Sequence, residues 1–319
     1  MDISYLLFLQ DIRMNAPDWF NELIQFITDT AGGILLVLIP MIIYFCIDKK
    51  KGEFVLISLS IGSVLNVFIK NIFCVYRPWM RSELVQPTKE AIDGAGGYSF
   101  PSSHTQGSAS SYGSIAYVYR KKKAVCVTFI CLVLLVAFSR NYLGVHTPQD
   151  VIVAILEAIA VIYLTSIIQK KIGDSEKSRL IFYFIVVGVI IVVTAFMVLK
   201  NYPVDYNSAG KIIYKPARAI KSYANKAGLI IGFLTAWILE GKYIAFNTDN
   251  LSLKTKLSRA FIGILFYFIS AILAVALSSI LSTKWTEAFA QNGILYFGTF
   301  FLGPLVFTKI EGLKSKIQG

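Results

Sequence analysis

The sequence predicts an all-α fold, a polytopic bundle of transmembrane helices. Of its 319 residues, 55% are hydrophobic, and the mean hydropathy is +0.63. Apolar runs long enough to cross a hydrocarbon layer of roughly 30 Å recur along the chain, and a soluble fold could not bury them all. Basic residues gather in short segments between these runs, which is typical of the cytoplasmic loops of membrane proteins.

The excess of basic over acidic residues is explained by this distribution of basic residues between the apolar runs. Lys and Arg number 31 against 19 Asp and Glu, which gives a net charge of +12. In a soluble protein this balance would suggest a nucleic-acid ligand, but here the charges flank apolar runs, so we expect no nucleic acid as a partner. The four cysteines lie in or beside apolar runs without metal-like pairing, so we interpret them as small apolar residues.

Residues 1–29 predict two short amphipathic helices that lie in the membrane interface. Apolar positions are mixed there with acids and with Arg13, and Pro17 interrupts the run. The segment lacks the basic start and the small-residue cleavage site of a signal peptide, so we expect no removed leader.

Six apolar runs follow within residues 30–199, and we predict that each forms a span. They cover about 31–47, 54–73, 104–119, 124–138, 150–169 and 180–199. The third run is short and rich in Ser and Gly, and small residues let a helix pack closely against its neighbours. We expect these six spans to form one core.

The order of the spans predicts the topology. Alternation places the basic segments 49–51, 120–123 and 170–179 on one side, which the positive-inside rule makes cytoplasmic. Residues 70–103 and 139–149 then lie on the opposite side. We expect a multi-pass protein of the plasma (inner) membrane whose active site faces the extracytoplasmic side.

Residues 200–319 predict about three further spans. These cover about 227–245, 259–281 and 291–308. The basic segment 201–226 falls on the outer side, so either an interfacial helix around residues 217–223 explains it or the span count after residue 199 is wrong by one. The segment fits a solvated interfacial helix better than a site for a diphosphate or an anionic headgroup. Three roles fit this C-terminal part: lining a substrate cavity, forming a homodimer, or only extending the bundle.

A polar stretch between the fourth and fifth spans carries an arginine, a histidine and an aspartate at the membrane edge, where charge usually marks a functional site. His146 and Asp150 are four residues apart. If a helix begins near Thr147, the carboxylate lies one turn beyond the imidazole and can accept a ring N–H. Taken alone, Asp150 also fits a helix cap at Thr147, with Pro148 at the first helical position.

Two further polar clusters are predicted on the same side. Lys70 and Arg77 share a helix face if the second span continues to Tyr76, and Pro78 then ends the helix. Residues 100–104, with the sequence F-P-S-S-H, precede the third span. Backbone N–H groups and hydroxyls at such a helix start favour anion binding.

Together the three clusters suit a phosphoryl group. The cations and hydroxyls can stabilise its oxygens, one imidazole can attack phosphorus, and the other can protonate the leaving oxygen. Taken singly, His104 fits a hydrogen-bonded interfacial histidine, and the cations fit headgroup anchors. These segments hold no cluster of carboxylates for Mg²⁺, so we expect no metal or other cofactor.

Three motifs occur in order and with helical spacing. They are K-x6-R-P at Lys70 to Pro78, P-S-S-H at Pro101 to His104, and S-R-x5-H-x3-D at Ser139 to Asp150. This set resembles the type 2 phosphatidic acid phosphatase family of integral membrane lipid phosphatases, over residues 30–199. The family usually has glycine where this chain has Ser103, and because a small residue is kept we expect backbone binding of phosphate to survive.

The resemblance implies a role for each motif residue. His146 attacks phosphorus and forms a phosphohistidine, with Asp150 raising its nucleophilicity. His104 protonates the departing lipid oxygen and later activates water. The residues implied to hold the phosphate are Lys70, Arg77, Ser102, Ser103 and Arg140. Members of the family are similar in needing no metal.

We therefore expect a membrane hydrolase that removes phosphate from a lipid phosphate or diphosphate of the undecaprenyl diphosphate, phosphatidylglycerol phosphate or phosphatidate type. One alternative is a phosphotransferase that passes the phosphoryl group from His146 to an acceptor other than water. Another is a non-enzymatic lipid transporter or binding scaffold. Glu157, two turns beyond Asp150, fits either a functional acid or a helix-to-helix hydrogen bond.

Overall fold

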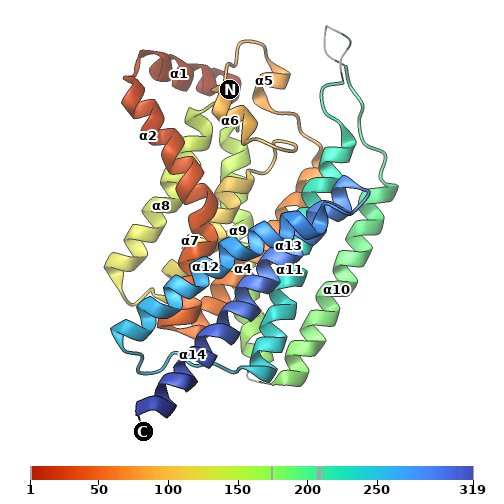
Figure 1. Ribbon diagram of the computed structural model, residues 1–319. Helices are drawn as coiled ribbons and strands as arrows, with labels where there is room; N and C mark the ends of the chain where they lie inside the picture. Colours follow the sequence, from red (N-terminus) through yellow and green to blue (C-terminus); the bar gives the residue numbers. More distant parts are fainter. Residues whose placement is uncertain (1, 174, 207–209, 211, 319) are drawn as a thin grey trace.

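The computed structural model describes residues 2–173, 175–206, 210 and 212–318, with side chains described as far as residue 313. It confirms the predicted all-α bundle: the described residues form helices joined by loops, and no strand is found among them. Most of the long helices run along one axis, and the N- and C-termini lie at opposite ends of that axis (Figure 1).

The N-terminal segment differs from the prediction in one respect. Helix α1 (Asp2–Asn15) lies across one end of the bundle, as expected for an interfacial helix, but α2 (Asp18–Asp29) turns at Pro17 and runs along the bundle (Figure 1). It continues through η1 (Thr30–Ile34), α3 (Leu35–Ile42) and η2 (Ile43–Ile47), so that residues 18–47 form one candidate span. The second predicted interfacial helix is therefore the outer part of the first span.

The next five helices follow the predicted runs. They are α4 (Lys49–Phe73), α7 (Ser103–Val118), α8 (Lys123–Tyr142), α9 (Pro148–Ile172) and α10 (Glu176–Leu199). Short helices α5 (Pro78–Arg81) and α6 (Lys89–Asp93) lie in the loop between α4 and α7, at the same end as α1 (Figure 1). The small residues of α7 have the expected effect, because this helix is almost entirely buried and packs against α4, α8 and α9.

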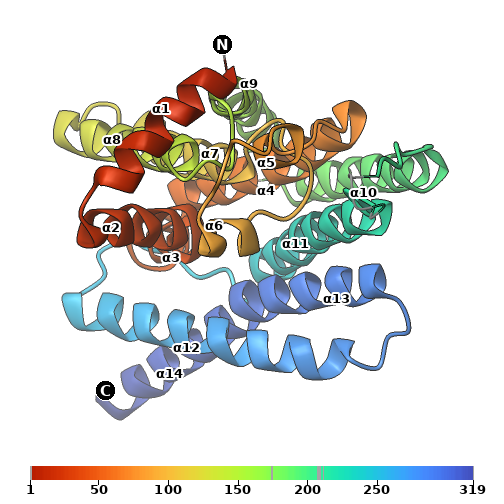
Figure 2. The same ribbon diagram turned by 90° about the horizontal axis from the view of Figure 1, so that it is seen from above.

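The C-terminal part forms three long antiparallel helical segments. Their helices are α11 (Pro216–Tyr243), α12 (Leu253–Ser278) and α13 (Lys284–Phe297), the last continuing through η3 (Gly298–Leu302) into α14 (Gly303–Gln318). Residues 217–223 are the first turns of α11, not a separate helix. Figure 2 shows α12, α13 and α14 as a layer along one side of the bundle, beside α2, α3 and α11.

Glycines bring α11 and α13 into backbone contact. A Cβ atom on Gly228 would lie 2.1 Å from the carbonyl oxygen of Phe289, and one on Gly232 would lie 2.3 Å from that of Gly293. No larger residue fits at either position without separating the helices. The register of α11 against its neighbours is therefore fixed within one turn of Lys226.

The start of α11 lies at the same end of the bundle as the loop that joins α4 to α7. Tyr76 donates a hydrogen bond to Asp205 at 2.7 Å, and the rings of Tyr98 and Tyr214 are 4.3 Å apart between centroids. The described part of the basic segment 201–226 therefore lies at the end of the bundle that carries the three polar clusters, and which side of the membrane this end faces stays a prediction.

The C-terminal helices share a core with the first six spans at the opposite end of the bundle. Glu240 of α11 pairs with Lys49 at 2.8 Å and accepts a hydrogen bond from Tyr44 at 3.0 Å. Arg259 of α12 pairs with Glu311 of α14 at 2.7 Å and donates to the carbonyl oxygen of Phe45 at 3.1 Å. Residues 200–319 therefore pack as part of the bundle.

The protein is a multi-pass membrane protein. Seven helical segments among the described residues are long and apolar enough to cross a bilayer, and α7 and α11 run through the bundle beside them. Large hydrophobic side chains on α10 and α12, such as Phe184 and Ile272, are exposed. Because water does not favour such a surface, these faces contact lipid.

Candidate active site

The three polar clusters converge at the end of the bundle that carries α1, α5 and α6. The second span ends at Phe73, as predicted, and does not continue to Tyr76, because Cys74 adopts a left-handed conformation (φ 51°). Lys70 therefore lies in the last turn of α4, whereas Arg77 caps the short helix α5. The two cations do not share a helix face, yet both are buried and both point into the same region.

His146 lies in the turn between α8 and α9, where Gly144 has a φ of +75°. As predicted, Thr147 caps α9 and Asp150 completes the capping box. The same carboxylate oxygen, Asp150 Oδ2, accepts hydrogen bonds from Thr147 N at 2.9 Å and Ser99 Oγ at 2.6 Å, and lies 3.1 Å from His146 Nδ1. Both interpretations of Asp150 therefore hold: it caps the helix and it orients the imidazole.

The other ring nitrogen of His146 faces Arg77. With a proton on Nδ1 donated to Asp150, Nε2 carries the lone pair, and it lies 2.7 Å from Arg77 Nη1. The remaining Arg77 donors bind the carbonyl oxygens of Val145, Gly96 and Gly97. Burial, and next the Arg77 charge, hold the pKa of His146 well below its ordinary value, so the ring is neutral at neutral pH.

Arg140 supplies free donors beside this histidine. It lies in the last turn of α8, its side chain is 1% exposed, and Nη1 donates to Thr28 Oγ1 at 2.8 Å. Its Nε and Nη2 groups have no hydrogen-bond partner among the described residues. Buried donors are nearly always satisfied, so these two N–H groups indicate a place for the oxygens of an anion.

Lys70, for which phosphate binding stays a prediction, is bound by the loop before α7. Its ammonium donates to the carbonyl oxygens of Tyr98 and Ser99, both at 2.9 Å, and of Pro101. Three carbonyls match the three N–H donors of a lysine, so in this structure Lys70 holds the loop that leads into α7.

The two serines of the second motif also have partners. Ser102 caps α7, where its hydroxyl accepts from Thr105 N at 3.4 Å and from Thr105 Oγ1 at 3.0 Å. Ser103 donates to Asn66 Oδ1 at 2.7 Å. Asn66 in turn donates to Glu157 Oε2 at 3.0 Å, which shows the helix-to-helix hydrogen bond considered for Glu157.

His104 follows in the first turn of α7. Its ring nitrogens have no hydrogen-bond partner among the described residues, and it lies within electrostatic range of Arg140, His146 and Arg77. A Cβ atom on Gly32 would lie 3.1 Å from His104 Cδ2, so this glycine makes room for the ring. The second histidine is therefore near the first and available for proton transfer.

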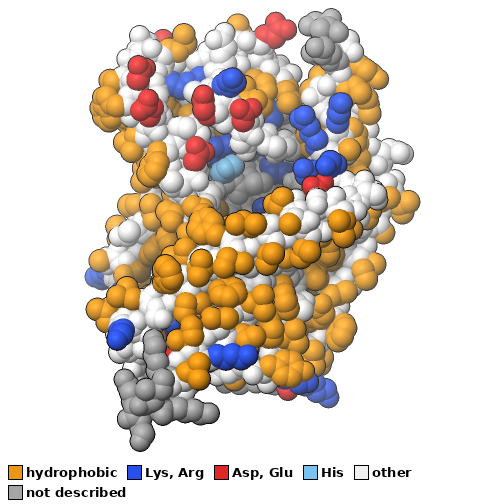
Figure 3. All heavy atoms as spheres, in the orientation of Figure 1, with side chains coloured by type: hydrophobic (Ala, Val, Ile, Leu, Met, Phe, Trp, Pro, Cys, Tyr) orange, Lys and Arg blue, Asp and Glu red, His pale blue; other side chains and the backbone are white. Residues whose placement is uncertain are grey.

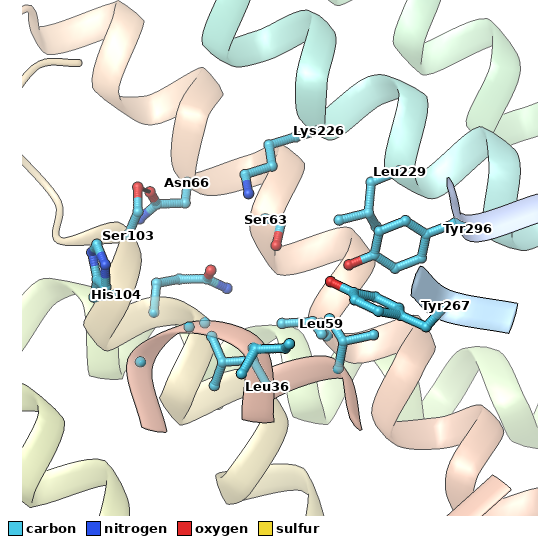
Figure 4. A pocket seen from close by; sticks show the side chains of 16 residues that line it. Leu36, Leu59, Ser63, Asn66, Ser103, His104, Lys226, Leu229, Tyr267 and Tyr296 are labelled. Atoms are coloured by element: carbon cyan, nitrogen blue, oxygen red, sulfur yellow. Dashed lines mark hydrogen bonds between the residues drawn. The ribbon is translucent and has the colours of Figure 1, made fainter. Parts of the chain in front are cut away.

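A cavity of about 300 Å³ opens beside His104. Figure 3 shows the face hollowed above α12 and α13, with a histidine in the wall and basic side chains near it, while hydrophobic side chains cover the surface below. The residues that line the cavity come from both parts of the chain. In Figure 4 they include Leu36, Leu59, Ser63, Asn66, Ser103, His104, Lys226, Leu229, Tyr267 and Tyr296.

Comparison with known proteins gives this site a family. The family model of the PAP2 superfamily matches residues 53–174. Phosphatidylglycerophosphatase B of Bacillus subtilis is 30% identical over 166 residues, which cover 48% of this chain and 77% of that protein. The chain belongs to the PAP2 superfamily. An undecaprenyl-diphosphatase of Sulfolobus acidocaldarius is 30% identical over 142 residues, 44% of this chain and 66% of that protein.

A second model, the PAP2 superfamily phosphatase transmembrane extension, matches residues 224–316. No solved structure matches the chain significantly. Membership in the PAP2 superfamily confirms the resemblance seen in the three motifs, and the protein is a membrane phosphatase, a hydrolase of phosphoric esters. The non-enzymatic alternative is thereby set aside.

Several residues at the PAP2 site were absent from the sequence-based prediction. Ser99 donates to the Asp150 carboxylate and Thr28 accepts from Arg140, but as single hydroxyls outside any motif they gave no signal. Lys226 was counted only among the outer basic residues. Its position directly before an apolar run was the one indication that it enters the bundle.

Proposed function

We propose that this PAP2 phosphatase hydrolyses a lipid phosphate or diphosphate through a phosphohistidine formed at His146. The observation that carries the proposal is the fixed orientation of the His146 ring. Asp150 holds Nδ1, so Nε2 faces Arg77 in a buried pocket beside the free donors of Arg140. A neutral, oriented imidazole among guanidinium groups suits attack on a phosphate dianion.

Substrate binding frees the nucleophile. A phosphate oxygen competes for the Arg77 N–H that now contacts Nε2, and the free Arg140 donors bind further oxygens. Once the Arg77 N–H turns to the phosphate, the Nε2 lone pair faces phosphorus. The Nε2–P bond forms as the P–O bond to the lipid breaks, and His104 gives the leaving oxygen its proton.

The second half of the reaction reverses the proton transfer. Water attacks the phosphohistidine and gives a proton to His104, the Nε2–P bond breaks, and inorganic phosphate leaves. Asp150 keeps the Nδ1 proton in place in both steps, because its carboxylate also holds Thr147 N and Ser99 Oγ. A turn of the His146 ring would break the hydrogen bond between Nδ1 and this fixed carboxylate.

The cavity and the relatives support a lipid substrate. Polar groups line the cavity next to His104, and Leu36, Leu59 and Leu229 line the rest. The names phosphatidylglycerophosphatase and undecaprenyl-diphosphatase describe enzymes that act on lipid phosphates. The positions of the basic segments 49–51, 120–123 and 170–179 at the other end support an extracytoplasmic active site.

The test is phosphate release by purified protein in detergent, without any acceptor other than water. We expect inorganic phosphate from the wild type and a loss on the order of 10⁴-fold for His146→Ala, the size expected for a missing nucleophile. A phosphoenzyme that is labile in acid and stable in base should form in the wild type and be absent from the variant. Wild-type rates in His146→Ala would refute the assignment of the nucleophile, and turnover that needs a lipid acceptor would favour the phosphotransferase.

Inhibitors provide a second arm of the same test. Orthovanadate resembles the five-coordinate phosphorus of the transition state and should inhibit release. EDTA should leave the rate unchanged, and a strong loss in EDTA would contradict the expectation of a metal-independent enzyme.

A further inference from the structure

A cation enters the cavity from the C-terminal extension. Lys226 of α11 lines the cavity, and Figure 4 shows its side chain pointing inward, above Ser63 and across from His104. It acts electrostatically on the His104 ring. No carboxylate of the described residues pairs with it. A cation held inside a membrane bundle without a partner is costly, and it usually marks a ligand site.

Two hydroxyls accompany this lysine. Tyr267 of α12 and Tyr296 of α13 line the same cavity, and in Figure 4 both hydroxyl groups point into it. Neither hydroxyl makes a hydrogen bond to another described residue. Together with Lys226 they form a set of donors that comes entirely from residues 200–319.

His104 lies between two groups of cations. Arg140 and Arg77 act on it from the side of the nucleophile, and Lys226 acts on it from the side of the extension. The first group serves the phosphate that is transferred. Lys226 therefore faces the leaving group, on the other side of the bond that His104 protonates.

The charge of the leaving group decides what such a cation does. When phosphatidate or another lipid monophosphate is cleaved, the product is an uncharged alcohol, and a cation gains nothing from it. When the lipid carries a second phosphate, the product stays anionic, and a cation stabilises it. Lys226 is useful only in the second case.

We propose that Lys226 binds a second phosphate of the substrate, so that this enzyme prefers lipids with two phosphates over lipids with one. The inference rests on the proposed function. The second phosphate can belong to a diphosphate or to a phosphodiester in the lipid headgroup, and Tyr267 and Tyr296 donate to the same group. When a diphosphate reacts, the His146 Nε2–P bond forms and the bond from that phosphorus to the bridging oxygen breaks. The lipid monophosphate is the leaving group, and its negative charge is stabilised by Lys226.

The experiment compares three substrates in mixed micelles. A polyprenyl diphosphate and phosphatidylglycerol phosphate carry two phosphates, and the polyprenyl monophosphate of the same chain length carries one. For Lys226→Met we expect kcat/KM to fall on the order of 10- to 100-fold on the two-phosphate lipids, as for one charged hydrogen bond. Release from the monophosphate should stay within about twofold, which also shows that the variant is folded.

Matched variants complete the design. Lys221→Met removes an exposed cation of the same helix that does not line the cavity, and it should leave all three activities unchanged. Lys226→Arg keeps the charge and should keep the preference for two phosphates. A loss with only one of the two-phosphate lipids identifies which of them supplies the group.

Three results would overturn the inference. In the first, Lys226→Met and Lys226→Arg both lose the same activity on all three lipids. In the second, neither variant loses activity, and in the third, the wild type prefers the monophosphate. A wild type that releases phosphate from none of the lipids would instead overturn the proposed function.

Discussion

The protonation of His146 is set by its surroundings. The side chain is 1% exposed, it faces a guanidinium group at 2.7 Å, and its one anionic neighbour in the described part of the chain is the Asp150 carboxylate at 3.1 Å. Burial and the Arg77 charge both disfavour an imidazolium ion, and Asp150 opposes them only in part. A nucleophilic histidine must be unprotonated, so this environment keeps the reactive form populated in mildly acidic solution.

This residue leads to a prediction about pH. Protonation of His146 would remove the proposed nucleophile, so kcat/KM should fall on the acid side as the pH passes through the pKa of this group in the folded protein. Because that pKa is lowered, the acid limb should lie below the ordinary histidine value of about 6.5. The measurement is the pH profile of kcat/KM for the wild type and for Asp150→Glu, which keeps the carboxylate. An acid limb at or above the ordinary value would contradict the predicted environment.

The same shift links stability to pH. Below the ordinary value the unfolded chain binds a proton at His146 that the folded protein does not bind. The contribution of this group to stability is therefore complete above about 6.5 and is lost progressively as the pH falls toward the lowered pKa of the folded protein. Thermal unfolding in detergent should show this acid destabilisation, and replacing His146 by Gln should reduce it.

At the scale of single residues, the sequence predicted what motifs can encode. His146, Asp150, His104, Arg77 and Arg140 all lie at one end of the bundle, as expected from their positions beside the spans. The exact partners could not be predicted. Lys70 binds three carbonyl oxygens because the loop before α7 turns them inward, and that turn depends on packing far along the chain.

Among the elements, the start of α9 serves both the stability of the fold and the proposed catalysis. Thr147 and Asp150 form its capping box, and Asp150 also orients His146. A capping box contributes about 1 kcal/mol. Both residues cap the helix, but only Asp150 orients His146, so variants at the two positions form a matched pair.

We predict that Thr147→Val and Asp150→Asn separate these functions. Thr147→Val should lower the free energy of unfolding by about 1 kcal/mol, because it removes the hydroxyl that accepts from Asp150 N, whereas the amide oxygen of Asp150→Asn can still accept from Thr147 N. Only Asp150→Asn should lower kcat, by about 10³-fold or more, because an amide can hold the wrong tautomer of His146. Phosphate release and thermal unfolding of the two variants check this. Equal kcat values would show that Asp150 acts only as a cap.

Local signals explain which elements could be predicted. The start of α9 is predicted by Thr147, Pro148 and Asp150, and the spans are predicted by apolar runs. The first span was placed too late, because acids in α2 suggested an interfacial helix. In the structure Pro17 ends α1, and Gly33, with φ −118° and ψ −114°, kinks the span without ending it. From sequence alone, a residue that ends a helix cannot be distinguished from one that only kinks it.

On the scale of the whole molecule, residues 200–319 contact the first six spans at both ends of the bundle. At one end they bring Lys226, Tyr267 and Tyr296 to the cavity, and at the other end Arg259 ties them to the first span through Phe45. Of the three roles considered for this part, cavity lining is the one that the contacts support. A homodimer stays a prediction.

This double attachment predicts two different losses. A chain that ends after residue 199 should be inactive, because one cavity wall is missing, and it should be unstable, because the aromatic core around Phe45 loses its cover. Arg259→Met acts far from the cavity, where it removes the ion pair with Glu311 and the hydrogen bonds to the carbonyl oxygens of Phe45 and Asn247. It should lower the free energy of unfolding by roughly 1–3 kcal/mol and leave kcat within about twofold at low temperature. Full activity of the truncated chain would contradict a role of the extension in the site.

The hollow beside His104 opens on the side of the bundle, in the face above α12 and α13. A molecule that enters there arrives by lateral diffusion within one leaflet. The concentration that determines its encounter with His146 is therefore its mole fraction in the membrane surface, and the same number of substrate molecules spread over more lipid should react more slowly. Dilution with inert detergent or phospholipid should lower the rate, whereas dilution with buffer should not.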